Sequence, residues 1–159
     1  MTRRDAVPPL EPAPGLAPPA ALAVAHPRPF ALRLVAETDS VSRAVAHVNN
    51  VEYVRWIDRA AELHADALGW TRERMAGEGR MWFVARHELD YRAECFAGDV
   101  LHAATWIERV DGARAWRRTA IWRAPEQPVL TALTAWALVD LATRRPVPLR
   151  SIPGAAPSA

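Results

Sequence analysis

The chain has 159 residues, half of them hydrophobic, which is enough for one domain with a substantial core. Its net charge is only +2 and its acidic residues are interleaved with the basic ones, which argues against a nucleic-acid partner. No run approaches the roughly 18 apolar residues of a membrane span, and the single Cys95 excludes a disulfide framework or a thiolate metal cluster. We therefore expect a cytoplasmic protein with no membrane contact and no bound metal.

Residues 1–29 form the first segment, and they contain eight of the 14 prolines. Proline has no backbone N–H to donate and its ring breaks helices, so we expect a disordered tail that forms neither strand nor helix. Residues 151–159 are expected to form a second, flexible tail. The folded domain would then span residues 30–150.

The first regular elements are a strand over residues 30–39, where apolar and polar residues alternate, and a connecting loop over residues 40–46. A single long helix is predicted over residues 50–68, with Asn50 as its N-cap, Glu52 in its first turn and Gly69 just beyond its end. Its charged residues follow one stripe, while nearly all others are apolar or small. We therefore expect most of the circumference of this helix to be buried, with His64 as a hydrogen-bonded core histidine.

After a loop that contains Gly77 and Gly79, the hydrophobic period changes from that of a helix to that of a strand. Strands are predicted over residues 81–92, 99–110, 113–123 and 129–141. The connections are short, and Asp111-Gly112 between two alternating runs is a strong hairpin signal. One strand, one buried helix and a run of consecutive strands predict an α+β fold, in which an antiparallel sheet wraps around a long central helix.

The start of the predicted helix reads His47-Val48-Asn49-Asn50, with Tyr53 one turn further on. Other segments follow in a fixed order, namely Arg55-Trp56, Asp58, His87-Glu88-Leu89-Asp90-Tyr91, Gly98-Asp99 and Thr134-Ala135-Trp136-Ala137-Leu138-Val139-Asp140. In this order and spacing the chain resembles the hotdog fold over residues 30–150. More narrowly, it is similar to the acyl-CoA thioesterases related to 4-hydroxybenzoyl-CoA thioesterase.

This resemblance implies hydrolysis of an acyl thioester, with acyl-CoA or an acyl carrier protein as the partner. It implies a homodimer or homotetramer, with sites between subunits, and no cofactor, since CoA is part of the substrate. In relatives a backbone N–H at the helix start polarises the thioester carbonyl, and by position the N–H of Asn50 would do this here. His47 could orient water or contact the thioester, and the alternative for His47 is a hydrogen bond that organises the loop. Asn49 and Tyr53 would contact substrate, with capping and packing as their alternatives.

The expected general base is not where relatives keep it. They place an Asp-x-Asp pair ahead of a Gly-His, and the corresponding positions here hold Val41 and Arg43, followed by Ala46. Asp39 could take this role if the loop is longer, and otherwise it is a solvated carboxylate. Asp58 could take it instead, since another hotdog branch keeps its acid about that far along the helix. The alternative for Asp58 is an ion pair with a neighbouring arginine on the same helix, Arg55 or Arg59.

Arg144 and Arg145, like Arg117 and Arg118, could bind the phosphates of CoA, with ordinary solvated charge as the alternative. We therefore hypothesise a homo-oligomeric acyl-CoA thioesterase with Asp39, His47, Asn50 and Asp58 as its catalytic candidates. The missing Asp-x-Asp leaves open a catalytically degenerate hotdog protein that binds acyl-CoA or an acyl carrier protein. A tailoring thioesterase that acts on a carrier-bound polyketide or fatty acyl chain is a further alternative.

Overall fold

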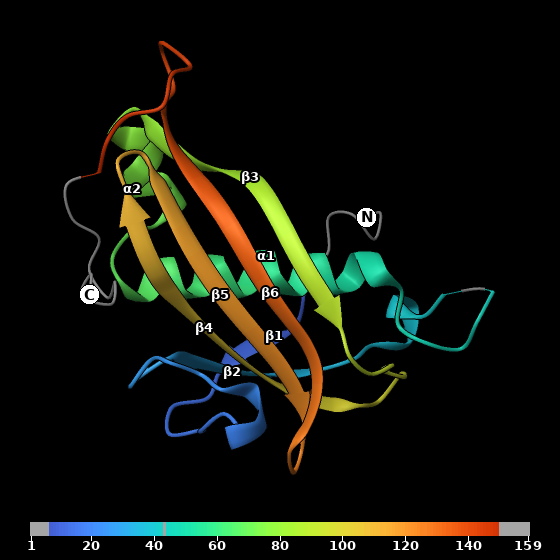
Figure 1. The fold of residues 1–159 in the computed structure, drawn as a ribbon. Helices are drawn as coiled ribbons and strands as arrows, with labels where there is room; N and C mark the ends of the chain where they lie inside the picture. Colours follow the sequence, from blue (N-terminus) through green and yellow to red (C-terminus); the bar gives the residue numbers. More distant parts are fainter. Residues whose placement is uncertain (1–6, 43, 150–159) are drawn as a thin grey trace.

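The computed structural model describes residues 7–42 and 44–149 of the chain. A six-stranded antiparallel sheet has the order β1-β2-β4-β5-β6-β3, and the long helix α1 lies across one of its faces (Figure 1). The strands are β1 (Leu10–Pro12), β2 (Phe30–Val35), β3 (Arg80–Tyr91), β4 (Val100–Asp111), β5 (Arg114–Arg123) and β6 (Gln127–Asp140). The helices are α1 (Asn50–Ala67), α2 (Arg72–Gly77) and the short 3-10 helices Ala20–Leu22 and Thr38–Ser40. The predicted α+β hotdog arrangement is confirmed.

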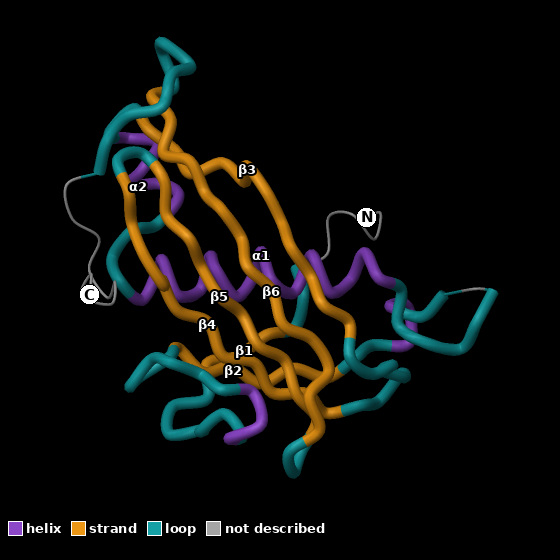
Figure 2. Tube along the Cα trace, in the orientation of Figure 1, coloured by secondary structure: helices purple, strands orange, loops and turns teal. Residues whose placement is uncertain are grey.

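Helix α1 lies against one face of the sheet (Figure 2). Its buried residues follow one side of the helix and Val51 is 61% exposed, so the prediction that most of its circumference is buried is wrong. Its buried residues are Glu52, Tyr53, Trp56, Ile57, Ala60, Ala61 and His64. Several of them share one core cluster with side chains from the strands, among them Leu32, Leu101, Ile121 and Leu130. The sheet and the helix therefore enclose a single main core.

The start of α1 differs from the prediction by one residue. Asn49, not Asn50, is the N-cap, because Asn49 has an extended backbone and its Oδ1 accepts a hydrogen bond from the N–H of Val51 at 3.2 Å. Asn50 is the first helical residue. The short helix α2, which begins after the capping Thr71, lies in a region predicted as loop.

The N-terminal segment contains regular structure that its prolines do not suggest. Strand β1 pairs with β2, so that Leu10 lies opposite Leu34, and the Leu10 side chain is only 6% exposed. A strand at the edge of a sheet tolerates Pro12, because one side of its backbone has no neighbouring strand to which an N–H would have to donate. The prediction that residues 1–29 form neither strand nor helix is therefore wrong for Leu10–Pro12 and Ala20–Leu22.

Further along this segment, Leu16, Leu22 and Val24 pack against a second buried cluster that includes Trp106 and Trp122. This cluster lies apart from the main core around α1. The flexible tail predicted for residues 151–159 lies outside the described residues, as do residues 1–6. Within the described ranges, no helix is long and apolar enough to cross a membrane.

We predict that Leu10→Ala lowers the free energy of unfolding by about 2 kcal/mol or more, because it leaves a cavity in the main core. Chemical denaturation of the full chain measures this change. Val7→Ala is the control, since Val7 is 66% exposed and its truncation should change stability by about 0.5 kcal/mol or less. Equal and negligible effects of the two substitutions would show that β1 does not belong to the folded domain.

Candidate active site

The first turn of α1 presents a backbone N–H that no described residue satisfies. The N–H of Asn49 donates to the Ser40 carbonyl at 2.9 Å, and the N–H of Glu52 donates to the Asn49 carbonyl at 2.9 Å. With Val51 bound to the Asn49 side chain, the N–H of Asn50 is left without an acceptor among residues 7–42 and 44–149. The positive end of the helix dipole lies at the same place, so this N–H can hold a carbonyl oxygen or an oxyanion.

Two tyrosines support this helix start. The Tyr91 hydroxyl, at the end of β3, donates to the Asn50 carbonyl at 3.2 Å, and its ring meets Tyr53 edge-on at 5.3 Å. Tyr53 is 2% exposed, and burial followed by its hydrogen bond with Cys95 raises its pKa. The geometry therefore favours packing for Tyr53. Tyr91 is the exposed aromatic residue at this mouth, a role that the sequence did not indicate.

The loop ahead of α1 doubles back on itself. Val41 and Val48 form an isolated antiparallel bridge, and the N–H of Ser42 donates to the His47 carbonyl at 2.8 Å. This excursion returns the chain to its starting point, where Ser40 hydrogen-bonds to Asn49. Residues that are far from Asn49 along the chain are therefore close to it in space.

Asp39 immediately precedes Ser40 and so lies near the helix start, despite its distance in sequence. It is exposed, and it lines a small cavity of about 20 Å³ together with Glu52, Arg55 and Trp56 from the first turns of α1. The role of Asp39 as the base stays a prediction. Asp39 is not found by counting a fixed number of residues back from His47, because the residues of the loop between Val41 and Val48 are included in the count.

His47 lies on the returning arm of this loop and is half-buried. Its Nδ1 lies 2.9 Å from the Val48 carbonyl oxygen, which can only accept, so Nδ1 carries the proton. The loop-organising role is therefore observed. In the neutral ring, this arrangement leaves Nε2 as an acceptor that can take part in orienting water.

Asp58 lies about 12 Å further along α1 than Asn50. Its carboxylate is 46% exposed and pairs with Arg72 of α2 at 3.7 Å. The prediction of a pair with Arg55 or Arg59 is wrong, since these arginines reach Glu52 and Glu62, at 3.2 and 2.7 Å. The reason is that the start of α2 brings Arg72 against α1.

A histidine that the sequence did not single out for this role lies close to Asp58. On β3, the Nδ1 of His87 is 2.9 Å from the Thr134 hydroxyl, across the β3–β6 ladder. Burial lowers the pKa of His87, and the negative charge of Asp58 raises it by less. Asp58 and His87 thus lie within electrostatic reach of each other, away from the helix start, although each has another partner, Arg72 and Thr134.

Arg144 and Arg145 do not join the helix start within one chain. They lie in the turn after β6, where the Arg144 guanidinium stacks over Phe83 at 5.7 Å. This turn is next to the beginning of β3, whereas Tyr91, which contacts Asn50, is at the end of β3 (Figure 1). The length of the strand separates the two places.

The structure gives no indication of a metal centre in the part of the chain that it describes. No group of three or more histidine, cysteine, aspartate or glutamate side chains there is arranged to hold an ion. Absence of a metal and of a cofactor stays a prediction.

Solved structures of thioesterases share this fold. An acyl-ACP thioesterase from Bacteroides thetaiotaomicron is 20% identical with a TM-score of 0.70, over 77% of this chain and 50% of that one. This chain thus spans half the length of the Bacteroides protein. A 1,4-dihydroxy-2-naphthoyl-CoA thioesterase from Synechocystis is 18% identical with a TM-score of 0.70, over 76% of this chain and 88% of that one. A hypothetical protein from Staphylococcus aureus in complex with CoA is 13% identical with a TM-score of 0.73, over 79% of each chain.

The curated proteins contain no match to this chain. A family model does match it, that of the Thioesterase-like superfamily, over residues 35–152. This stretch includes β3 to β6, the whole of α1 and the loop that carries Asp39 and His47, and it begins at Val35, the last residue of β2. On this match and this fold, the chain belongs to the thioesterase-like superfamily, as its resemblance to hotdog thioesterases predicted.

Proposed function

We propose that this protein hydrolyses acyl thioesters to a free acid and a thiol. The observation that carries the proposal is the unsatisfied N–H of Asn50 at the positive end of a buried helix, in a member of a thioesterase superfamily. The carbonyl oxygen of the thioester accepts from this N–H. As water attacks the carbonyl carbon, negative charge builds up on the same oxygen, where the helix dipole stabilises it.

The attacking water has to lose a proton, and Asp39 is the proposed acceptor. Its carboxylate lies near the helix start, and His47 can hold the water through Nε2. When the tetrahedral intermediate collapses, the C–S bond breaks and the thiolate takes up the proton that Asp39 accepted from water. Asp58 is the alternative base, with His87 beside it.

The proposed partners are acyl-CoA or an acyl carrier protein, and a second copy of this chain. Strand β3 supports self-association, because it is last in the order of the sheet and is 12 residues long. Exposed Phe83, Val84 and Tyr91 lie along it. Such an edge can pair with the same strand of another copy. The number of subunits and the cytoplasmic location stay predictions.

One observation favours a second function, that of an acyl-CoA-binding protein without turnover. Asp39 is exposed, and none of the described residues holds its carboxylate by a hydrogen bond or an ion pair. A base that is not positioned contributes less to catalysis. Binding would need only the helix start and the apolar surface around it.

Thiol release from a panel of acyl-CoA and acyl-carrier-protein thioesters tests the proposed function directly. The expected result is turnover of at least one aliphatic or aromatic thioester by the purified full chain. Tight binding of acyl-CoA with no thiol release from any thioester would instead establish the binding protein.

We predict that Asn50→Pro lowers kcat about 10²–10³-fold, the usual effect of removing one oxyanion donor. Proline removes the N–H and is well tolerated at the first position of a helix. The preceding residue, Asn49, already has the extended backbone that a residue before proline prefers (φ −65°, ψ 136°).

Asn50→Ala is the matched control, because it keeps the N–H and loses only the side chain. It should retain kcat within a few-fold, and both variants should unfold at the temperature of the unmodified protein. If Asn50→Pro is as active as Asn50→Ala, the N–H of Asn50 does not bind the oxyanion.

We predict that Asp39→Asn lowers kcat about 10²–10⁴-fold at saturating substrate, since it removes the general base. Asp58→Asn should have a much smaller effect, and Asp111→Asn in the β4–β5 hairpin is the surface control. Full activity of Asp39→Asn together with loss of activity in Asp58→Asn would show that Asp58, and not Asp39, is the general base.

A further inference from the structure

A second pocket, of about 390 Å³, lies between the later turns of α1, the helix α2 and strands β3, β5 and β6. Most of its lining is apolar and aromatic, with Leu68, Trp70, Met75, Trp82, Ile107 and Trp136 among the residues that form it. The volume falls within the range of ligand pockets, which are largely apolar with a few polar groups. None of Asp39, His47 and Asn50 lines it.

One wall of this pocket carries a buried cation. Arg117 projects from β5 toward α1, is 7% exposed and lines the pocket. Its Nη1 lies 2.7 Å from His64 Nδ1 and 3.3 Å from the Thr105 hydroxyl. No carboxylate among the described residues forms an ion pair with it. Burial lowers the pKa of Arg117 to about 10, so it is still charged at neutral pH.

The contacts of Arg117 do not neutralise this charge. Burial, and then the positive charge of Arg117, lower the pKa of His64 to about 3, so His64 is neutral and accepts through Nδ1. Both acceptors meet the same Nη1, which leaves Nε and Nη2 without an acceptor in the described part of the chain. Neither atom is among the fully buried donors without a partner, so both keep access to the pocket, where water or an anion can accept from them.

A second donor nearby is also unsatisfied. The ring of Trp136 lines the same pocket, and its indole N–H is buried without a hydrogen-bond partner. Trp136 lies on β6 opposite Ala115, two residues before Arg117 on β5. Because the Trp136 N–H is enclosed by the protein, the donors that face the pocket itself are those of Arg117.

The acidic residues around the pocket do not form an ion pair with Arg117. Asp58 and Glu62 line it but pair with Arg72, at 3.7 and 3.0 Å, and Glu62 also pairs with Arg59. Asp66 is exposed, so water and salt screen its charge. Arg117 is therefore the buried cation in the lining of this pocket that pairs with no described carboxylate.

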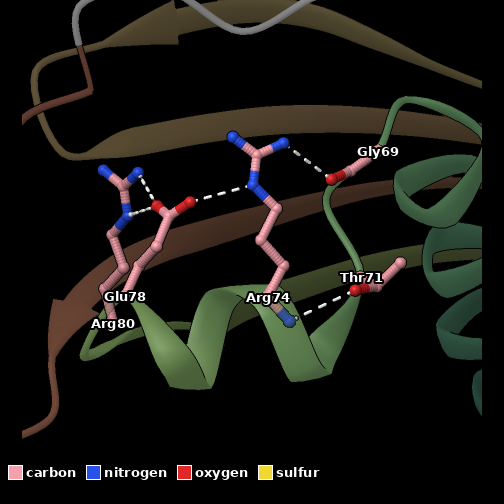
Figure 3. Close-up of polar contacts among 5 residues, drawn as sticks. All are labelled: Gly69, Thr71, Arg74, Glu78 and Arg80. Atoms are coloured by element: carbon pink, nitrogen blue, oxygen red, sulfur yellow. Dashed lines mark hydrogen bonds and ion pairs between the residues drawn. The ribbon is translucent and has the colours of Figure 1, made fainter.

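The wall formed by α2 holds its shape without a ligand. Arg74 and Arg80 both bind Glu78, and Arg74 also donates to the Gly69 carbonyl at 3.0 Å (Figure 3). The same guanidinium groups stack on the Trp70 ring, at 4.9 and 5.4 Å from its centroid. The pocket is therefore preformed, which reduces the cost of binding.

We propose that this pocket binds an apolar molecule that ends in a carboxylate, with the Arg117 guanidinium donating to the carboxylate oxygens. The planar fork of an arginine matches a carboxylate, and its free Nε and Nη2 are suited to two parallel hydrogen bonds. The apolar body of the ligand lies among Trp70, Met75 and Trp136. This binding goes beyond the proposed hydrolysis and does not require the site at Asn50.

Calorimetric titration of the full chain with octanoate and with 4-phenylbutanoate tests this proposal. At least one of the two acids should bind at one site per chain, and the corresponding alcohol, which lacks the charge, should bind at least about tenfold more weakly. Equal affinity for the acid and the alcohol, or no binding of either acid, would overturn the proposal.

The variant Arg117→Met should weaken acid binding at least about tenfold and leave alcohol binding unchanged. It should fold, because it replaces an unpaired buried charge by an apolar side chain of similar length. Arg118→Met is the control, since Arg118 is the next residue on β5, points to the opposite face and pairs with Glu108. Asn50→Pro should bind the acid as the unmodified protein does, which separates this pocket from the helix start. Unchanged acid affinity in Arg117→Met would contradict the proposal.

Discussion

Helix α1 is held against one face of the sheet by Tyr53, Trp56, Ile57 and Ala60, all of which are nearly inaccessible to solvent. Burial of a large apolar side chain contributes about 1.5–3 kcal/mol, so this contact is a main source of stability. An α-helix is a rigid element with a fixed rise per residue. Once its apolar face is placed, the direction of its N-terminus and the position of every polar group along it follow.

Two polar features lie along this helix, and they differ in kind. At its start, the N–H of Asn50 is a backbone donor whose strength comes from the helix dipole. About four turns further on, His64 meets the charged Arg117 from β5, deep between helix and sheet. The first feature is open to a substrate at the surface. The second lies in a low-dielectric surrounding, where an unmatched charge has a large effect.

The two edges of the sheet are also unlike. Strand β1 pairs with β2 and forms one edge of the sheet. It is short and contains a proline, and both features disfavour pairing with a further strand. Strand β3, at the opposite edge, is long and carries exposed apolar residues. Of the two edges, β3 is the one that the proposed self-association would use. The same strand holds His87 beside Asp58 and Tyr91 beside Asn50, so any partner on this edge lies next to both candidate groups.

Much of the fold is predictable from the sequence, because it depends on local patterns. The alternation in the four later strands, the apolar face of α1 and the Asp111-Gly112 turn each act through neighbouring residues, and all are present in the structure. The motif around Asn49 and Asn50 likewise locates the helix start to within one residue. The prediction from the prolines of residues 1–29 was wrong because it used local information only. The backbone of Leu10–Pro12 forms its hydrogen bonds with β2, and no local sequence pattern indicates this pairing.

The site depends on contacts between residues distant in sequence, and these only the tertiary structure decided. The hairpin-like loop returns Ser40 to Asn49 and so brings Asp39 near the helix start. The packing of α2 assigns Asp58 to Arg72. The strand ladder separates Arg144 from Asn50, and the crossing of α1 over β5 leaves Arg117 buried against a neutral histidine. Sequence alone determined which elements form, because periodicity and capping are local. Which charges meet was decided by packing, because electrostatic partners are set by distance in space.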